Sequence, residues 1–302
     1  MAQLDYVVVD VFTDRALAGN PLAVVTDTKG LETARMQAIA REFNLSETTF
    51  IQRRAADVER SEGVRVRIFT TQEELPFAGH PTLGTASVLR MMAPETAVDD
   101  TVRLALNVGT VPVRFHGEAA RSDVLFGEMT QRDPEFGAEL DRAQVAQLSG
   151  LALDDLDSSP PQVVSTGTGF AIVPLRSAAG LARLKVDHDA ATSYLRGLGA
   201  RWFYVLALVP DQNETGAHSW RARMQFYGGE DPATGSAAGC AISYLVGHGL
   251  VPAGELIHLR QGIEIGRPSD IFLSAWRENS RVTDVRVGGS TVLVAKGKLL
   301  LE

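Results

Sequence analysis

The sequence has few of the residues from which several common kinds of site are built. It contains one cysteine, Cys240, among 302 residues, so an intramolecular disulfide is impossible and a thiolate zinc site would lack ligands. The six histidines are scattered without the spacing of a metal site. A Walker A run and a GxGxxG sequence after a strand are both absent, which argues against the common phosphate-binding loops. We therefore expect a protein of the reducing cytoplasm that holds no metal.

Basic charge and long apolar runs are also scarce. The 29 Lys and Arg residues against 37 Asp and Glu residues give a net charge of −8, so we expect binding neither to nucleic acid nor to an anionic membrane. No stretch approaches the roughly 18 apolar residues of a membrane span, and the opening MAQLDYVVVDVF lacks the basic region of a signal peptide. The length and the 45% apolar content predict two ordinary globular domains.

Two short patterns occur twice in the chain. Gly19-Asn-Pro-Leu-Ala-Val-Val resembles Gly167-Thr-Gly-Phe-Ala-Ile-Val, 148 residues later, and His80-Pro-Thr-Leu-Gly-Thr-Ala resembles Asp231-Pro-Ala-Thr-Gly-Ser-Ala, 151 residues later. Two matches at nearly the same spacing, close to half the chain length, predict an internal duplication. We expect two pseudo-symmetric domains at residues 1–118 and 119–302, with a linker near Gly117–Arg121 and with final strands that can cross back to the first domain.

Strand signals outnumber helix signals in both halves. Most predicted strands follow one another through hairpins, including one at Gly288-Gly289, so we expect an α+β fold with mostly antiparallel sheets. Small residues crowd the first turns of the helices predicted at 81–91 and 232–248, which is typical of a helix inside a curled, barrel-like sheet. Two further helices are predicted at 32–43 and 142–148. Strands are predicted at 5–11, 23–26, 65–69, 102–106, 110–115, 162–165, 170–174, 203–209, 222–226, 282–287 and 291–295.

The two repeated helix starts combine features that suit proton chemistry. Asp231 followed by proline is a favourable N-cap and first residue, and the small residues after it leave backbone N–H groups open to an anion. Taken alone, such a start would simply cap its own helix. His80 stands in the matching place, however, and histidine is a poor N-cap whose ordinary pKa near 6.5 suits proton transfer. With approximate twofold symmetry, both starts would face a common cleft between the domains.

Glu47 is the asymmetric element of the pattern. It lies in Asn44-Leu-Ser-Glu-Thr-Thr-Phe50, where a loop enters a predicted strand, whereas the second half reads Leu198-Gly-Ala-Arg-Trp-Phe203 and has no acid in a comparable setting. From these residues alone, Glu47 is either a solvated loop acid or a catalytic base. Cys240 falls on a helix of small residues, and we expect it to be a packed core thiol.

Several motifs together carry a family resemblance. Gly19-Asn20-Pro21, Ser46-Glu47-Thr48, the stretch from Leu75 to Thr82, Glu230-Asp-Pro-Ala-Thr-Gly-Ser236 and the stretch from Gly262 to Ser269 are similar to motifs of the PhzF-like isomerase family of phenazine biosynthesis. The resemblance runs from about Asp5 to Leu300. The family shares the fold of diaminopimelate epimerase, with two similar domains that each wrap a curled sheet around a central helix and with the site between them.

This resemblance implies an isomerase that moves a proton on a small carboxylate-bearing substrate without a cofactor, and it implies a homodimer. Glu47 matches the family acid that removes and returns the proton, and His80 and Asp231 match polar residues of the site, so we assign these three as catalytic. The same motifs predict substrate contacts for the residues nearest to them: Asn20, Ser46, Gly79, Thr82, Gly235 and Ser236.

Two other functions remain open from the sequence. One is an amino-acid epimerase or racemase, which needs two opposed bases. The epimerase branch places its catalytic cysteines near Gly79 and Asp231, and Cys240 aligns with neither position, which disfavours cysteine-based epimerisation. The other is a ligand-binding member of the family that has lost catalysis.

Overall fold

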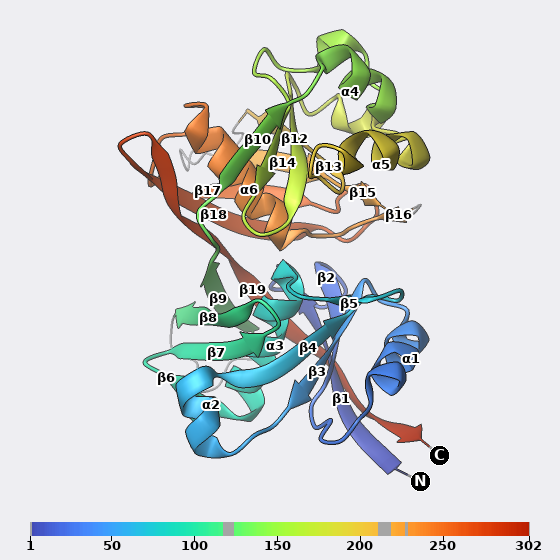
Figure 1. Ribbon diagram of the computed structural model, residues 1–302, viewed down its shortest axis with the longest axis vertical. Coiled ribbons are helices and arrows are strands. Elements are labelled where there is room, and N and C mark those ends of the chain that lie inside the picture. The colour runs from blue at the N-terminus through green and yellow to red at the C-terminus, as the bar shows by residue number, and fades with distance from the viewer. Residues whose placement is uncertain (1, 117–123, 211–218, 227–228, 302) are drawn as a thin grey trace. The chain divides into compact units, whose positions relative to one another are not determined.

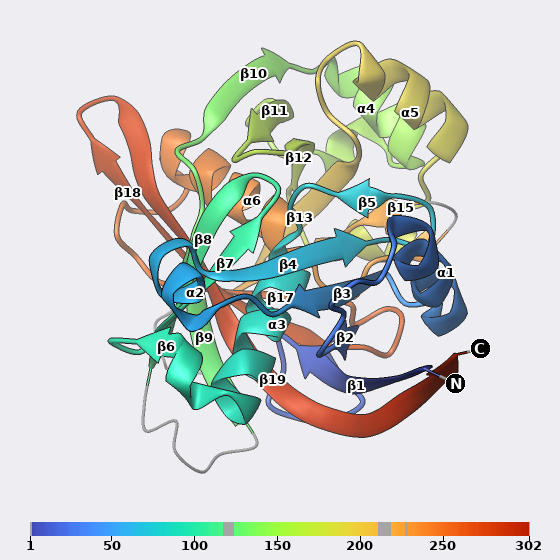
Figure 2. The same ribbon diagram turned by 60° about the horizontal axis from the view of Figure 1, so that its bottom comes forward.

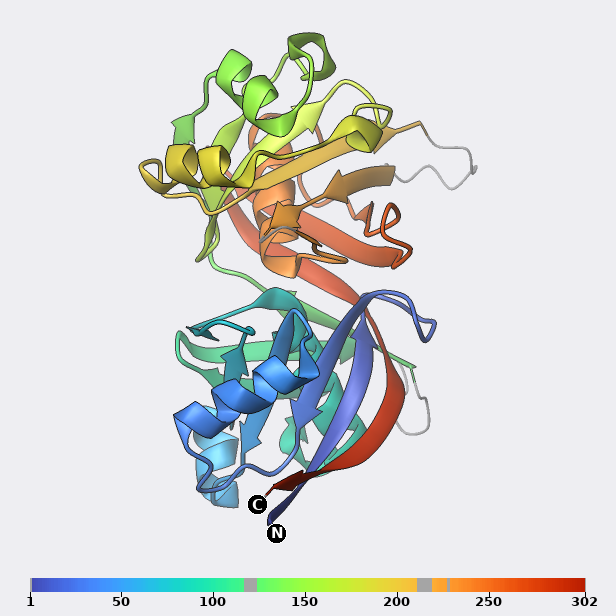
Figure 3. The same cartoon turned by 90° about the vertical axis from the view of Figure 1, so that its right-hand side faces the viewer.

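The computed structural model describes residues 2–116, 124–210, 219–226 and 229–301 (Figure 1). The chain forms two compact units, one of Met1–Thr130 with Gly288–Glu302 and the other of Gln131–Val287. The first and last strands are antiparallel partners with Ala2 opposite Leu301, so the two ends of the chain lie side by side in the first unit (Figure 3). The linker expected at Gly117–Arg121 lies outside the described residues.

The first unit is a barrel of strands around one helix. Its elements in chain order are β1 (Ala2–Val11), β2 (Asn20–Val25), α1 (Thr33–Phe43), β3 (Glu47–Gln52), α2 (Ala56–Glu62), β4 (Val64–Phe69), β5 (Glu74–Leu75), α3 (Gly79–Met92), a 3₁₀ turn (Pro94–Thr96), β6 (Ala97–Val98), β7 (Thr101–Leu106), β8 (Gly109–His116), β9 (Val124–Thr130) and the later part of β19 (Arg281–Leu301).

Hydrogen bonding closes this sheet on itself. It passes from β1 through β2, β3, β4, β7, β8 and β9, and β19 pairs with both β9 and β1. Most pairs are antiparallel, but β2–β3 and β4–β7 are parallel, because the connections through α1 and α3 bring the chain back to the same end of the sheet.

Helix α3 occupies the interior of the barrel. Every residue from Gly79 to Leu89 is buried, and the helix contacts β1, β2, β3, β7, β8 and β9, among which Figure 2 shows it. The small residues make this possible: a Cβ on Gly84 would lie 2.7 Å from side-chain atoms of both Leu22 and Val11. On the outer face of the sheet, Met36 and Ile39 of α1 pack against Val25 and Phe50.

The second unit also has a sheet with helices on both faces. Its elements are β10 (Glu135–Glu139), α4 (Arg142–Ser149), a 3₁₀ turn (Leu153–Asp155), β11 (Gln162–Ser165), β12 (Gly169–Leu175), a 3₁₀ turn (Leu181–Arg183), α5 (His188–Arg196), β13 (Phe203–Val209), β14 (Ser219–Arg223), β15 (Gln225–Phe226), β16 (Gly229–Glu230), α6 (Gly235–Gly247), β17 (Ile257–Gln261), β18 (Ser269–Glu278) and the start of β19.

Helix α6 packs on one face of this second sheet and α4 and α5 pack on the other. Helix α6 contacts β11, β12 and β18, while Val145 of α4 and Leu195 of α5 share a core cluster with Val173 and Val205. Strand β12 is buried at every residue, as expected for a strand covered on both faces. The sequence prediction of an α+β fold, with curled and mostly antiparallel sheets around a helix, is confirmed.

Three local predictions were wrong. Gly288 and Gly289 lie inside the continuous strand β19 instead of forming a hairpin. Neither glycine has a positive φ, and a Cβ on Gly288 would lie 3.1 Å from the ring of Phe126, so this glycine permits close approach of a neighbouring strand. Helices α2 and α5 were not anticipated, and the strand predicted at 222–226 is interrupted between β14 and β15.

Candidate active site

Glu47 is the first residue of β3 and is held there by the end of α1. Helix α1 stops at Asn44, which takes the left-handed conformation with φ 51°, as asparagine tolerates well at a helix C-terminus. The chain then turns through Ser46 and enters β3, which pairs in parallel with β2 so that Glu47 lies opposite Leu22. The Glu47 side chain is largely buried but 16% exposed, so its carboxylate is accessible to solvent.

His80 lies in the first turn of α3, directly beside Glu47. Its Nε2 atom is 3.6 Å from Oε2 of Glu47, and its side chain is 4% exposed. On the other side of the ring, Nδ2 of Asn20 lies 3.2 Å from Nδ1 of His80. Because an amide nitrogen can only donate, Nδ1 accepts this hydrogen bond and the imidazole proton resides on Nε2, on the side of Glu47.

Burial keeps the His80 imidazole uncharged. Desolvation lowers the pKa of His80 from 6.5 to about 3, since a buried cation would lose its hydration. The contact with Glu47 at 3.6 Å is therefore not an ion pair at neutral pH, and Nε2 of His80 makes no hydrogen bond to the residues that the structure describes. The arrangement presents a carboxylate next to a neutral N–H group. This N–H group can donate a hydrogen bond to a substrate, and it does not compete with the carboxylate for the substrate's proton.

The other predicted residues of the first unit lie around this pair. Ser46 precedes Glu47 and is partly buried, and Gly79 is the first residue of α3. The Thr82 hydroxyl is completely buried and donates to the carbonyl of Ala78 at 2.7 Å. Thr82 thus stabilises the helix start, and its contact with a substrate stays a prediction.

Asp231 belongs to the second unit, and it does not cap α6 as the sequence pattern suggested. The helix begins at Gly235, and the N-cap position is occupied by Thr234. Oδ2 of Asp231 accepts a hydrogen bond from the Thr234 hydroxyl at 2.6 Å. The Thr234 N–H donates to Oε1 of Gln261 at 3.1 Å. Gln261, and not the Asp231 carboxylate, thus satisfies this backbone donor at the helix start. Gly235 and Ser236 form the first turn of α6.

Gln261 organises this helix start and was not among the site residues predicted from the sequence. Its side chain is fully buried at the end of β17. Its amide nitrogen donates to the Asp231 carbonyl at 2.8 Å and to the Thr234 hydroxyl at 2.9 Å, and Tyr204 donates to its oxygen at 2.9 Å. The sequence feature that could have indicated this role is a glutamine at one of the alternate, buried positions of the strand Ile257–Gln261.

The structure also corrects the register of the repeat. Arg67 binds Glu74 and Arg223 binds Glu230, each pair with a shortest distance of 2.5 Å and each seven residues apart. The two arginines and the two glutamates are each separated by 156 residues. The same separation joins Gly79 and Gly235, the first residues of α3 and α6.

This register matches Pro76 with Pro232, Leu75 with Asp231 and His80 with Ser236. The sequence comparison had instead aligned Pro81 with Pro232, because each of them precedes a glycine by three residues. The first turns of α3 and α6 therefore differ in chemistry, because the matched position is His80 in α3 and Ser236 in α6. Common ancestry of the two units stays a prediction.

Cys240 lies on α6, completely buried. Its sulfur is 3.6 Å from the Thr166 hydroxyl and 3.7 Å from the Thr168 carbonyl, and burial raises its pKa to about 11. A thiol in this environment stays protonated at neutral pH and is unsuited to act as a base.

Two properties of the described residues bear on the class of site. Within residues 2–116, 124–210, 219–226 and 229–301, no group of three or more His, Cys, Asp or Glu side chains could hold a metal ion. In the same part of the chain, no helix has the length and apolar character needed to cross a bilayer.

Comparison with known proteins identifies the family. The family model described as phenazine biosynthesis-like protein matches residues 9–297. Trans-2,3-dihydro-3-hydroxyanthranilate isomerase of Pseudomonas aeruginosa is 38% identical over 299 residues, covering 98% of this chain and 99% of that protein. A protein of Mesorhizobium japonicum that is described as an uncharacterised isomerase is 36% identical over the whole of both chains.

Solved structures agree with this result. A predicted epimerase from Pseudomonas aeruginosa superimposes with a TM-score of 0.82 at 35% identity, covering 99% of this chain and 100% of the other. A PhzF-family protein of Bacillus anthracis superimposes with a TM-score of 0.84 at 25% identity over the whole of both chains. A hydroxyproline epimerase from Agrobacterium vitis, with a TM-score of 0.63 at 11% identity, covers 99% of this chain and 91% of its own and shares the fold alone. The chain therefore belongs to the phenazine biosynthesis-like, or PhzF, family and is an isomerase of that family.

Proposed function

We propose that the protein moves a proton between two carbon atoms of a small carboxylate-bearing substrate, without a cofactor, and that Glu47 carries the proton. The observation that supports this most strongly is the placement of an accessible carboxylate beside a buried imidazole that burial keeps neutral. Glu47 can accept a proton in this setting, whereas His80 cannot remove it again. The carboxylate is then the one group of the pair that changes protonation during turnover.

His80 and Asn20 have supporting roles in this mechanism. Asn20 holds the imidazole through Nδ1, which fixes the Nε2–H group toward the Glu47 side. When Glu47 has removed the proton, negative charge develops on the substrate, and a neutral N–H donor can stabilise it. Glu47, now protonated and 16% exposed, exchanges its proton with solvent in part and delivers a proton or deuteron to a second carbon on the same face. Acid–base help of this kind typically supplies about 10²- to 10⁴-fold in rate.

The first turns of the two central helices supply further donors for the anion. Backbone N–H groups at a helix start lack intrahelical partners and point along the positive end of the dipole. We assign this role to the α3 start at Gly79 and the α6 start at Gly235 and Ser236. We also assign Asp231 as a third ionisable group that contacts the substrate.

The substrate of the named Pseudomonas relative is the natural first test. Incubation with trans-2,3-dihydro-3-hydroxyanthranilate in D₂O, followed by NMR of the product, distinguishes the possible reactions. A proton shift predicts a double bond in a new position and deuterium at one carbon. Inversion at a single carbon without a positional shift would assign an epimerase instead. Tight binding without any exchange, over a panel of cyclic and acyclic carboxylates, would assign a binding protein.

Two properties of the whole protein belong to the same proposal. We assign a homodimer as the working assembly, which sedimentation equilibrium of the purified chain tests directly. We also assign the cytoplasm as its compartment, because its single cysteine is a buried free thiol and such a chain needs no oxidising environment. Fractionation of the producing cell checks the second assignment.

A further inference from the structure

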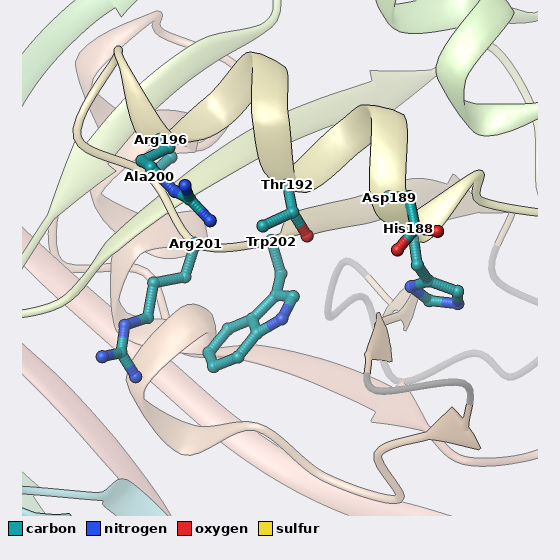
Figure 4. Close-up of a pocket in the computed structure, with 7 residues that line it drawn as sticks. All are labelled: His188, Asp189, Thr192, Arg196, Ala200, Arg201 and Trp202. Carbon is teal, nitrogen blue, oxygen red and sulfur yellow. The ribbon is translucent and has the colours of Figure 1, made fainter.

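A series of buried hydrogen bonds runs from strand β13 to Asp231, before the start of α6. Directly before β13, the segment Ala200–Trp202 and helix α5 line a pocket of about 590 Å³ (Figure 4). Tyr204, the second residue of β13, does not line this pocket. It is fully buried, and its hydroxyl donates to Oε1 of Gln261 at 2.9 Å. Tyr204, Gln261, Thr234 and Asp231 form a network within the second unit, and the mechanism above uses only its last member.

The direction of each hydrogen bond in the network follows from one backbone group. The Thr234 N–H can only donate, and it donates to Oε1 of Gln261 at 3.1 Å, which identifies the other end of the amide as Nε2. This nitrogen donates to the Asp231 carbonyl at 2.8 Å and to the Thr234 hydroxyl oxygen at 2.9 Å. The hydroxyl hydrogen of Thr234 therefore points away from Gln261. It is donated to Oδ2 of Asp231 at 2.6 Å.

Burial makes this arrangement rigid. Tyr204 and Gln261 are completely buried, and Asp231 and Thr234 are only 6% and 7% exposed. Burial, followed by the negative charge of Asp231, raises the pKa of Tyr204, so the phenol keeps its proton and remains a donor to Gln261. A hydrogen bond to a carboxylate is strong when little water competes for it. The network thus fixes both the place and the hydrogen-bonding role of one Asp231 oxygen.

The bond between the Thr234 hydroxyl and Asp231 is not explained by helix capping. The Thr234 N–H is satisfied by Gln261, and the Asp231 N–H donates to the Met224 carbonyl at 2.9 Å. Asp231 and its neighbours are therefore held in place through the backbone. The hydroxyl bond acts on the carboxylate alone, and its effect is to orient that group.

We propose that Thr234, Gln261 and Tyr204 are positioning residues that hold the Asp231 carboxylate in one orientation as a hydrogen-bond acceptor. Asp231 then meets a donor group of the substrate as an oriented carboxylate and not as an acid. The contact with the substrate rests on the proposed function. The orientation of the carboxylate is a property of the second unit by itself.

Two substitutions of Thr234 test the effect on turnover. Thr234→Val keeps the shape of the side chain without its hydroxyl and should lower kcat/KM for trans-2,3-dihydro-3-hydroxyanthranilate about tenfold or more. Thr234→Ser keeps the hydroxyl and should stay within about threefold of the wild type. The matched control is Ser243→Ala, which removes another buried hydroxyl of α6, one that donates to the Gly239 carbonyl at 2.7 Å. It should change kcat/KM by less than about twofold.

A double-mutant cycle with Asp231→Ala separates positioning from a general loss of structure. If Thr234 acts through Asp231, Thr234→Val lowers kcat/KM about tenfold in the presence of Asp231 and less than about twofold in Asp231→Ala. Equal losses in the two backgrounds would show that Thr234 acts independently of Asp231 and would overturn the proposal. Wild-type kcat/KM in Thr234→Val, with Asp231→Ala impaired, would overturn it as well.

Crystal structures of the wild type, Thr234→Val and Thr234→Ser measure the orientation without turnover. The Asp231 carboxylate should be rotated in Thr234→Val and should keep its wild-type position in Thr234→Ser. An unmoved carboxylate in Thr234→Val would overturn the positioning role whatever the kinetics show. A rotated carboxylate combined with full turnover by Asp231→Ala would instead contradict the contact of Asp231 with the substrate in the proposed function, and the positioning role would stand.

Discussion

Acidification should destabilise this protein through His80. The pKa of His80 is about 3 in the folded protein against 6.5 for an exposed imidazole. The unfolded chain therefore binds one more proton than the folded chain between these two values, and stability falls as the pH drops through that window. At pH 7 the effect is nearly absent. A pH of 5 is about 1.5 below the ordinary pKa of histidine. Protonation of His80 in the unfolded state therefore lowers the free energy of unfolding by about 2 kcal/mol at this pH.

The choice of pH 5 makes the prediction robust. It lies well above the folded pKa, so the expected loss depends on the ordinary pKa of histidine and hardly on how deeply burial depresses it. Urea unfolding of the wild type and of His80→Asn at pH 7 and pH 5 measures the effect as a difference of differences, in which the carboxylates common to both proteins cancel. The wild type should lose about 2 kcal/mol more than the variant. Equal losses in the two proteins would refute the neutral, buried imidazole and the role given to it.

Three further predictions concern the central helices. Gln261→Leu removes four buried hydrogen bonds, which Gln261 makes with Asp231, Thr234 and Tyr204, and should lower the free energy of unfolding by about 3 kcal/mol or more, measured by urea titration. Gly84→Ala should cost about 1–2 kcal/mol, because the added methyl overlaps two buried side chains in the barrel, whereas Gly197→Ala, with open space around it, should be close to neutral in the same assay. Cys240, whose pKa burial raises to about 11, should react with iodoacetamide only at the rate of unfolding, and fast alkylation of the native protein would contradict its placement.

The overall fold was predictable because its signals are local. Alternating apolar residues mark the strands, and the small residues from Gly79 to Leu89 mark a helix that must fit inside a barrel. The same local reading failed at Gly288. A glycine pair in an apolar stretch is typical of a hairpin, and only the approach of Phe126 from a distant strand shows why glycine stands there. Side-chain packing between remote segments is not visible in the order of the residues.

The site shows the same division. The loop that carries Glu47 into a strand follows from turn preferences and is present. His80 was expected at the N-cap of its helix, but the helix begins at Gly79 with Ala78 as its N-cap, so His80 lies inside the first turn. Asp231 was expected to cap α6, but Gln261, thirty residues away in sequence, takes over that hydrogen bond.

The central claim is that the Glu47 carboxyl carries the proton, and solvent deuterium uptake by substrate in Glu47→Gln tests it most directly. Glu42→Gln, an exposed glutamate of α1, is the matched control. The account predicts that Glu47→Gln binds trans-2,3-dihydro-3-hydroxyanthranilate but loses deuterium uptake by about 10²- to 10⁴-fold, while Glu42→Gln behaves as the wild type. Undiminished uptake in folded Glu47→Gln would show that another group moves the proton.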